Sequence, residues 1–303
     1  MTLLRPFALD RPETLEEAAA VLTEHGGGAA LYAGGTELLL LMKEGLVRVQ
    51  RLVDVKRVRG LADIRAEDAT VVIGATARHR AVEISALLRE RCPLVAGVAR
   101  HVANVRVRHV GTVGGNLAFA DPHSDVATLF LALDAELVLW RRAGERRLSL
   151  GDFLLGAYET ARRDAEILTG VRLHPWPAGT ASAYLKFGVH ERPTLGVALA
   201  VTPAGAGAPA AVRLSVGCVG PKPQRFPEIE RQAARMGVAE LAARAPALAQ
   251  AAADAVETAS DLHGAADYKR DMTRVFVRRA FEIVAARAAG EEPRARYPYT
   301  VIV

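Results

Sequence analysis

Residues 110–125, VGTVGGNLAFADPHSD, place two glycines after a short apolar run and follow them with Asn116 and, farther on, a Ser-Asp pair. A related stretch, LYAGGTELLL, lies at residues 31–40. Each reads as a strand that ends in paired glycines and continues with a small polar residue. Because glycine has no Cβ and accepts positive φ, such a turn can point successive main-chain N–H groups at an anion. The pattern predicts either two main-chain anion sites or two tight turns without a ligand.

The natural ligand of such a turn is a phosphate group. Two loops on separate lobes suit the pyrophosphate of one dinucleotide, and Thr36, Glu37, Thr112 and Asn116 could bond its phosphate, ribityl or ribose oxygens. No GxGxxG follows the first strand and no GxxxxGK[ST] is present, so neither a Rossmann domain nor a P-loop is predicted. From the residues alone, a dinucleotide cleft and simple turns both stay open.

The composition is that of a folded enzyme-sized chain. Its 303 residues are 50% hydrophobic, which suffices for two domains or three small ones, and its evenly spread charges (24%) argue against disorder. Apolar runs fall short of the ~18 residues of a membrane helix. The start, MTLLRPFALD, lacks the features of a signal peptide, so we expect a cytoplasmic protein without an integral membrane segment.

Cysteine and arginine usage limits the possible functions further. Cys92 and Cys218 lie far apart, without a CxxC motif, so we expect buried thiols and neither a metal site nor an iron–sulfur cluster in this chain. The net charge of +5 comes from arginines gathered at 100–108, 141–147 and 270–279. Aromatics (5%) do not alternate with them, so nucleic-acid binding is not expected. We therefore expect these arginine-rich segments to form solvated faces or an interface with an acidic subunit.

Periodicity and turn residues predict an α+β chain. A helix should begin near Thr14 and end at the glycines 26–28, Pro93 should lie in the first turn of a helix, and Gly144 should turn a hairpin. Pro and Gly at 175–179 indicate a domain boundary, followed by two strands and several helices. We divide the chain into a first lobe (1–55), a second lobe (56–177), a C-terminal domain (178–290) and a tail (291–303).

Several stretches, taken together, resemble a known family. AGGTELLLLMKEG (33–45) and HVANVRVRHVGTVGGNLAFADPHSDVATLFLALDAEL (101–137) carry the likeness, and FALDRPETLEEAAAVL, LVDVKRVRGLADI, GATARHR and DYKRDMTRVFVRRAF extend it over nearly the whole chain. They resemble the FAD-binding medium subunit of the xanthine dehydrogenase / carbon monoxide dehydrogenase family of molybdenum hydroxylases. The resemblance implies a two-lobed FAD-binding domain of the PCMH / vanillyl-alcohol-oxidase type. A C-terminal α+β domain of a small antiparallel sheet plus helices should follow it.

The resemblance also implies which residues bind FAD. They fall in the two glycine loops, beside the second loop, and at single positions farther on. They are Leu31, Tyr32, Ala33, Gly34, Gly35, Thr36, Glu37, Leu38, Val102, Val107, Gly111, Thr112, Gly114, Gly115, Asn116, Ser124, Asp125, Leu168 and Lys186. No catalytic residue and no metal ligand is implied.

Two of these positions have alternative interpretations. Asp125 could accept a hydrogen bond from a ribityl hydroxyl or the flavin N3–H, or it could only cap the helix that begins at Val126. Lys186 could stabilise negative charge near the flavin N1 and C2=O, or it could be a surface lysine at a strand end.

The sequence departs from the family at three places. His109 stands where relatives commonly have Asn, and KFGVHERPTLGVA keeps Lys186 and Arg192 but lacks the acidic residue that often follows the arginines. The second lobe also lacks the Cys-bearing insertion of the 4-hydroxybenzoyl-CoA reductase branch, which argues against that branch.

The resemblance implies an electron-transfer flavoprotein subunit, an oxidoreductase component that carries FAD. Its expected partners are a molybdenum-pterin large subunit and a [2Fe-2S] small subunit, in a dimer of heterotrimers, with NAD or a quinone-type acceptor. An alternative is a free-standing FAD-dependent oxidase or dehydrogenase that uses His101, His109, His123 or His190 on its own substrate. A third is a scaffold that has lost its nucleotide, which the intact loops disfavour.

Overall fold

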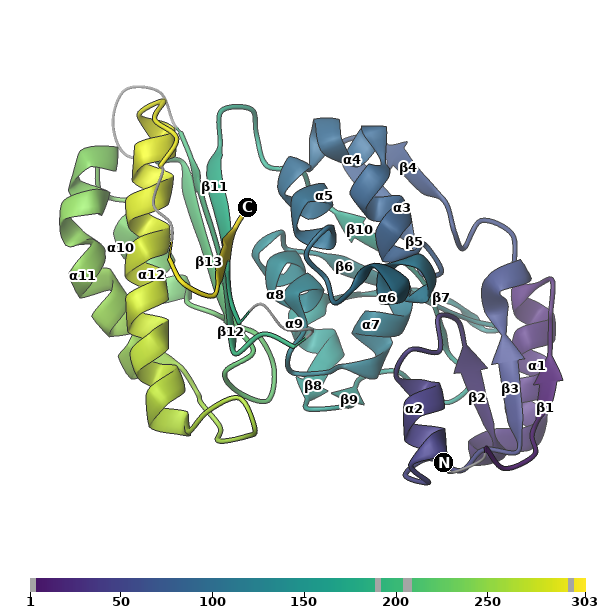
Figure 1. Ribbon diagram of the computed structural model, residues 1–303. Helices are drawn as coiled ribbons and strands as arrows, with labels where there is room; N and C mark the ends of the chain where they lie inside the picture. The colour runs from purple at the N-terminus through teal and green to yellow at the C-terminus, as the bar shows by residue number, and fades with distance from the viewer. Residues whose placement is uncertain (1–3, 189–191, 204–208, 294–296) are drawn as a thin grey trace.

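The computed structural model describes residues 4–188, 192–203, 209–293 and 297–303. Along the chain, a small lobe, a larger lobe and a C-terminal domain follow one another from one end of the molecule to the other (Figure 1). Each is built on its own sheet, and a two-stranded hairpin completes the second lobe. The α+β class predicted from the sequence is confirmed.

The first lobe is a three-stranded parallel sheet in the order β1-β3-β2. Its elements are β1 (Ala8–Asp10), α1 (Leu15–His25), β2 (Ala29–Tyr32), α2 (Leu38–Lys43) and β3 (Arg51–Asp54). Thr14 caps α1 by accepting a hydrogen bond from the Glu17 amide, and Gly26 ends it at φ 48°. Ala18, Ala19 and Leu22 are buried on α1, and the predicted start and end of this helix are confirmed.

The second lobe is a five-stranded antiparallel sheet in the order β4-β5-β10-β6-β7, covered by short helices. Its strands are β4 (Ile64–Glu67), β5 (Thr70–Gly74), β6 (Glu136–Arg141), β7 (Gly144–Ser149), β10 (Ile167–Leu173) and the hairpin β8 (Leu154–Gly156) with β9 (Glu159–Thr160). Its helices are α3 (His79–Ile84), α4 (Ala86–Arg91), α5 (Pro93–Ala99), α6 (Val105–Val110), α7 (Val113–Phe119), α8 (Asp125–Ala132) and α9 (Leu150–Phe153). Pro93 opens α5 and Gly144 turns the β6–β7 hairpin, as predicted.

The C-terminal domain has a five-stranded antiparallel sheet in the order β14-β13-β12-β11-β15. Its elements are β11 (Ala181–Phe187), β12 (Leu195–Thr202), β13 (Ala211–Gly217), β14 (Gln224–Arg225), α10 (Pro227–Ala233), α11 (Val238–Ala255), α12 (Ala266–Ala288) and β15 (Thr300–Ile302). Residues 291–303 were assigned to a tail, yet β15 adds an edge strand to β11. The end of that segment therefore belongs to the C-terminal sheet.

Strand alternation gives this sheet two buried faces. On β11, Ala183 and Leu185 point into the core formed with α11 and α12, whereas Tyr184 packs into the core of the second lobe. Helix α8 of the second lobe lies against β12 and β13 on that opposite face (Figure 1). Because a strand places successive side chains on opposite sides, Lys186 shares the face of Tyr184 and points toward the second lobe.

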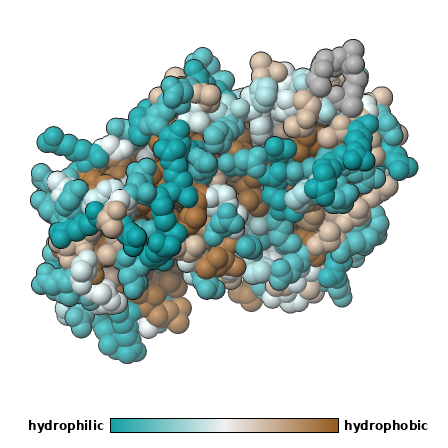
Figure 2. All heavy atoms as spheres, turned by 180° about the vertical axis from the view of Figure 1, so that it is seen from behind, coloured by the Kyte–Doolittle hydropathy of each residue, from teal (hydrophilic) through white to brown (hydrophobic). Residues whose placement is uncertain are grey.

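The basic segment 270–279 forms part of a solvated helix face. On α12, Arg270 pairs with Asp267 and Arg274 with Asp271, both at i,i+3 spacing. On the side shown in Figure 2, hydrophilic side chains cover most of the surface and apolar ones form separate patches. In the described part of the chain, no helix is long and apolar enough to cross a membrane.

Candidate functional site

A cleft of about 820 Å³ lies between the two lobes, and the C-terminal domain borders its mouth. Of the nineteen positions that the resemblance implied, all line this cleft except Gly111 and Lys186. The cleft is of a size typical for a small-molecule or cofactor site. The sequence therefore identified two walls of one cavity, one from each lobe.

The first glycine loop leaves its main-chain amides open. It connects β2 to α2, and Gly35 has φ +71°, which favours glycine. None of the hydrogen bonds among the described residues uses the amides of Gly34, Gly35 or Thr36, whereas the Gly35 carbonyl accepts from Leu39 N at 3.1 Å. Three consecutive N–H groups are thus available to an anion in the cleft.

Lys56 holds the first loop from behind. Its Nζ donates to the Ala33 carbonyl at 3.0 Å, pairs with Asp54 Oδ1 at 2.7 Å and lies 3.9 Å from the centroid of the Tyr32 ring. Ala33 and Tyr32 line the cleft, but Lys56 does not. The lysine therefore fixes the conformation of the loop without facing a ligand.

The second glycine loop differs from the expectation, because protein groups already use most of its amides. Val113 N donates to the Ala77 carbonyl at 2.9 Å, and Gly114 N donates to the Ala75 carbonyl at 2.8 Å. Gly115 N donates to Thr112 Oγ1 at 3.1 Å, because Thr112 is the N-cap of α7. The idea that both loops offer runs of bare amides is thus correct for the first loop only.

The glycines of the second loop instead allow close packing. A Cβ on Gly114 would lie 2.5 Å from Cβ of Ala75, so α7 packs directly on the segment after β5. A Cβ on Gly34 would lie 2.5 Å from the Val110 carbonyl oxygen, where the two lobes touch. A side chain at either position would push apart walls of the cleft.

Because protein carbonyls and hydroxyls already accept from the amides of the second loop, polar side chains are the groups that this wall offers to a ligand. Ser124 Oγ donates to Asn116 Oδ1 at 2.6 Å and accepts from Ala127 N at 3.0 Å. This bond orients the Asn116 amide, whose NH₂ group has no acceptor among the described residues and lines the cleft. Ser124 is therefore the N-cap of α8, and the alternative that Asp125 is merely the cap is wrong.

Lys186 is neither on the surface nor on the cleft wall. Its side chain is only 3% exposed, and its Nζ lies 2.7 Å from Asp125 Oδ2. Asp125 itself lines the cleft. The lysine thus lies behind the carboxylate, and the alternative of a surface lysine is wrong.

The segment that joins β5 to α3 forms a further wall that sequence reasoning missed. Thr76 Oγ1 and His79 Nδ1 are buried and lack a hydrogen-bond partner in the described structure, although both residues line the cleft. Burial, and secondarily the charge of Arg108, lowers the pKa of His79 to about 4, so this imidazole is neutral.

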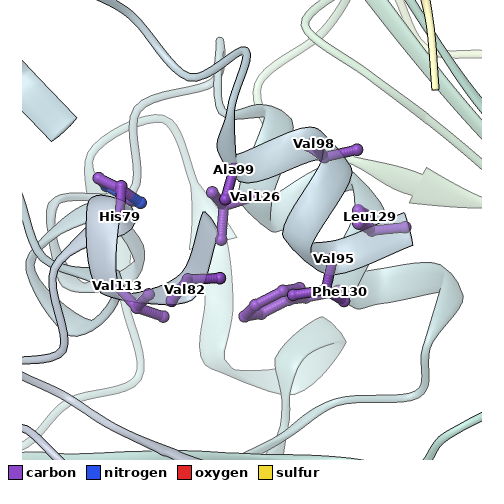
Figure 3. Close-up of a pocket in the computed structure, with 9 residues that line it drawn as sticks. All are labelled: His79, Val82, Val95, Val98, Ala99, Val113, Val126, Leu129 and Phe130. Carbon is purple, nitrogen blue, oxygen red and sulfur yellow. The ribbon is translucent and has the colours of Figure 1, made fainter. Parts of the chain in front are cut away.

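His79 also borders a second, very small cavity. This cavity measures about 10 Å³, close to the minimum for one water, and its other lining side chains are all apolar (Figure 3). His79 thus separates the apolar core of the second lobe from the cleft.

The mouth of the cleft is bridged by Arg192 of the C-terminal domain. Its Nη2 lies 2.9 Å from Glu37 Oε2 of the first loop, and its Nε lies 3.0 Å from Asp121 Oδ2 of the second lobe. All three residues line the cleft. One arginine therefore joins all three parts of the chain where the cleft opens.

The predicted histidines do not assemble as a catalytic group. His123 lines the cleft, but Asp261 and the Pro193 carbonyl hold both of its ring nitrogens. His101 and His109 do not line the cleft, and His190 falls outside the described residues. Cys92 and Cys218 are free and buried, as expected, and no group of metal-ligating side chains occurs in the described ranges.

These residues fit a dinucleotide cofactor. The amides of Gly34, Gly35 and Thr36 have no hydrogen-bond acceptor among the described residues, and neither the Asn116 NH₂ group nor two buried polar atoms, Thr76 Oγ1 and His79 Nδ1, have a partner there. Close contacts at the glycines set the distance between the walls of the cleft. An elongated ligand with a central diphosphate and polar groups at its ends satisfies all of them. The fold and the cleft thus define a two-lobed dinucleotide-binding protein.

Comparisons with known proteins identify the kind of dinucleotide. Residues 5–176 match the model of the FAD binding domain in molybdopterin dehydrogenase, and residues 189–284 match that of the CO dehydrogenase flavoprotein C-terminal domain. The carbon monoxide dehydrogenase medium chain of Hydrogenophaga pseudoflava is 34% identical over 93% of this chain and 98% of that protein. The 6-hydroxypseudooxynicotine dehydrogenase complex subunit alpha of Paenarthrobacter nicotinovorans is 29% identical over 91% of this chain and 93% of its own length.

A solved structure agrees with these matches. Quinoline 2-oxidoreductase from Pseudomonas putida 86 superposes with a TM-score of 0.88 and 26% identity, covering 94% of this chain and 99% of the matched chain. This chain belongs to the family of FAD-binding subunits of molybdopterin dehydrogenases, with the FAD-binding domain followed by the CO dehydrogenase flavoprotein C-terminal domain.

Proposed function

We propose that this chain is the electron-transfer subunit of a molybdenum-containing hydroxylase or dehydrogenase complex. In this proposal it receives electrons from the [2Fe-2S] clusters of a partner subunit and delivers them to NAD or a quinone-type acceptor. The carrying observation is the cleft of about 820 Å³, which is lined by both glycine motifs of the FAD-binding domain. FAD, when bound, supplies the chemistry, because a flavin can take up electrons singly and release them as a pair.

Within the cleft, each wall has a proposed task. The open amides of Gly34, Gly35 and Thr36 bind the pyrophosphate, since consecutive N–H groups favour a compact anion. The Asn116 amide donates to a ribityl or phosphate oxygen, and Asp125 accepts from a flavin N–H or hydroxyl. Leu168, which lines the same cleft from β10, gives an apolar surface for a ring.

The substrate of the complex lies outside this chain in the proposal. The relatives with near-complete overlap are named for carbon monoxide, for 6-hydroxypseudooxynicotine and for quinoline, three chemically different molecules. Three different substrate names on one kind of subunit support a substrate site outside this subunit. We therefore assign substrate oxidation to a molybdenum-pterin large subunit and electron entry to a [2Fe-2S] small subunit, in a dimer of heterotrimers.

Expression of the full chain alone and together with candidate partner subunits tests the proposal. Alone, the chain should hold one FAD, identified by releasing and chromatographing the nucleotide, and the substrate of the complex should not reduce that flavin. With the partners, the substrate of the complex should bleach the flavin absorbance. A chain that does not bind FAD, or that oxidises the substrate of the complex with O₂ in the absence of the partners, would overturn the proposal.

A further inference from the structure

The carboxylate of Asp125 connects the cleft to the C-terminal domain. It lies in the first turn of α8, is 5% exposed and lines the cleft. Both of its oxygens are held from β11, because Tyr184 Oη donates to Oδ1 at 2.8 Å and Lys186 Nζ donates to Oδ2 at 2.7 Å. The C-terminal domain thus fixes an acidic group in the wall of the FAD-binding domain.

The two donors are themselves well fixed. Lys186 Nζ also donates to the His101 carbonyl at 2.9 Å, which closes a contact with the segment after α5. Tyr184 is 1% exposed, and burial, followed by the nearby Asp125 charge, raises the pKa of its phenol well above the usual range. The tyrosine therefore remains a hydrogen-bond donor, and the lysine compensates the charge that burial would otherwise disfavour.

The neighbours of Asp125 do not replace this cation. His101 has a lowered pKa, chiefly because of burial, and the pKa of the Cys218 thiol is raised well above its usual range for the same reason. Asp121, ahead of α8, adds only negative charge. The arginines of β13 and β14 contact Asp134 at the other end of the helix.

We propose that Tyr184 and Lys186 are positioning residues that act through Asp125, fixing the orientation of its carboxylate so that FAD retention depends on the contact between the C-terminal domain and the second lobe. This inference rests on the proposed function. It differs from a direct flavin contact of Lys186, because the lysine does not line the cleft. It also differs from a purely structural ion pair, since such a pair would stabilise the domain interface without affecting how FAD binding responds to pH.

The affinity of the full chain for FAD, measured by flavin fluorescence from pH 6 to 8, tests the inference. The wild-type Kd should be constant, because Tyr184 and Lys186 hold both oxygens of Asp125. Lys186→Met leaves the buried carboxylate of Asp125 without its cation, so this carboxylate should accept a proton more readily than in the wild type and then no longer accept a hydrogen bond at that oxygen. Log Kd should therefore rise by up to about one unit per pH unit of acidification. Lys186→Arg should restore a flat profile, and Tyr184→Phe should give a weaker slope than Lys186→Met.

Two further variants separate the outcomes. Asp125→Asn combined with Lys186→Met should lose the pH slope, because the carboxyl that lost its cation is no longer present. Asp134→Asn removes an interdomain pair that does not touch the cleft, and its profile should match the wild type. A Kd for FAD that does not change with pH in Lys186→Met, or the same pH dependence of the Kd in Asp134→Asn as in Lys186→Met, would overturn the inference. Failure of the wild-type chain to bind FAD would instead overturn the proposed function.

Discussion

Gly34 of the first lobe lies against the main chain of Gly111 in the second, so closely that a Cβ on Gly34 would be 2.7 Å from Cα of Gly111. This contact sets the distance between the walls that carry the two loops. It explains why Gly111 belongs to the motif although it does not line the cleft.

A methyl group at position 34 should therefore open the cleft. We expect Gly34→Ala to lower the free energy of unfolding by about 1–3 kcal/mol, as overpacked contacts do, and to weaken FAD binding by about tenfold or more. Urea unfolding and FAD titration measure the two effects. Gly151→Ala is the control, because a Cβ there would meet its neighbours at ordinary distances of 3.7 and 3.8 Å. Equal behaviour of the two variants would disprove the tight lobe contact.

Lys56 should matter for FAD although it does not face the cleft. Lys56→Met removes the bond to the Ala33 carbonyl and the cation above the Tyr32 ring, so the first loop loses its support. We expect the Kd for FAD to rise about three- to tenfold, the value of roughly one such contact.

The matched control for Lys56 is Lys222→Met. Lys222 Nζ also donates to a main-chain carbonyl, that of Leu154, at 2.8 Å, but away from the first loop. FAD affinity should stay unchanged in this variant. If both lysine variants bind FAD like the wild type, the first loop does not need Lys56 to keep its shape.

Arg192 should govern how fast FAD leaves. Its side chain is 42% exposed, so each of its two ion pairs is worth no more than about 1 kcal/mol and is weakened by salt. Arg192→Met should raise the dissociation rate about three- to tenfold at low salt. At high salt, the wild-type rate should approach that of the variant.

Stopped-flow displacement of FAD measures these rates. Arg274→Met removes an exposed pair with Asp271 on α12, far from the cleft, and should leave the rates unchanged. A dissociation rate of Arg192→Met equal to that of the wild type at low salt would mean that the bridge across the mouth does not retain the cofactor.

Sequence reasoning found the parts of the site that depend on local geometry. The first glycine pair follows strand β2, as predicted, and the Ser-Asp pair marked the start of α8. The strand predicted before the second pair is wrong, because helix α6 precedes it and Gly114 and Gly115 lie inside helix α7. Which loop has free amides was harder to predict. Amides of the second loop donate to the carbonyls of Ala75 and Ala77, which lie more than thirty residues earlier in the chain.

Long-range contacts also explain what the sequence did not indicate. Thr76 and His79 stand in an ordinary strand-to-helix turn and become a cleft wall only when α7 packs on it. The pairing of Lys186 with Asp125 requires β11 to lie against α8, and β15 joins the sheet from a segment that resembles a tail. No local pattern encodes these contacts.

His79 should make the stability of the chain depend on pH. Its pKa is about 4 in the folded state, against an ordinary value of 6.5, so below pH 6.5 the unfolded chain binds more protons than the folded one. Stability contributed by the neutral imidazole is complete above pH 6.5 and is lost as the pH falls toward 4. Between pH 7 and pH 5 the loss from this group is about 2 kcal/mol.

Replacing the imidazole should remove this slope. His79→Gln keeps a polar side chain but cannot titrate, so the difference in urea unfolding free energy between pH 7 and pH 5 should shrink by about 2 kcal/mol relative to the wild type. His174→Gln is the control, because the His174 side chain is 49% exposed and does not line the cleft. All other carboxylates and histidines cancel in the comparison of variants. An unchanged slope in His79→Gln would mean that the folded protein accommodates a charged imidazole beside Arg108, which burial on the wall of this cleft should prevent.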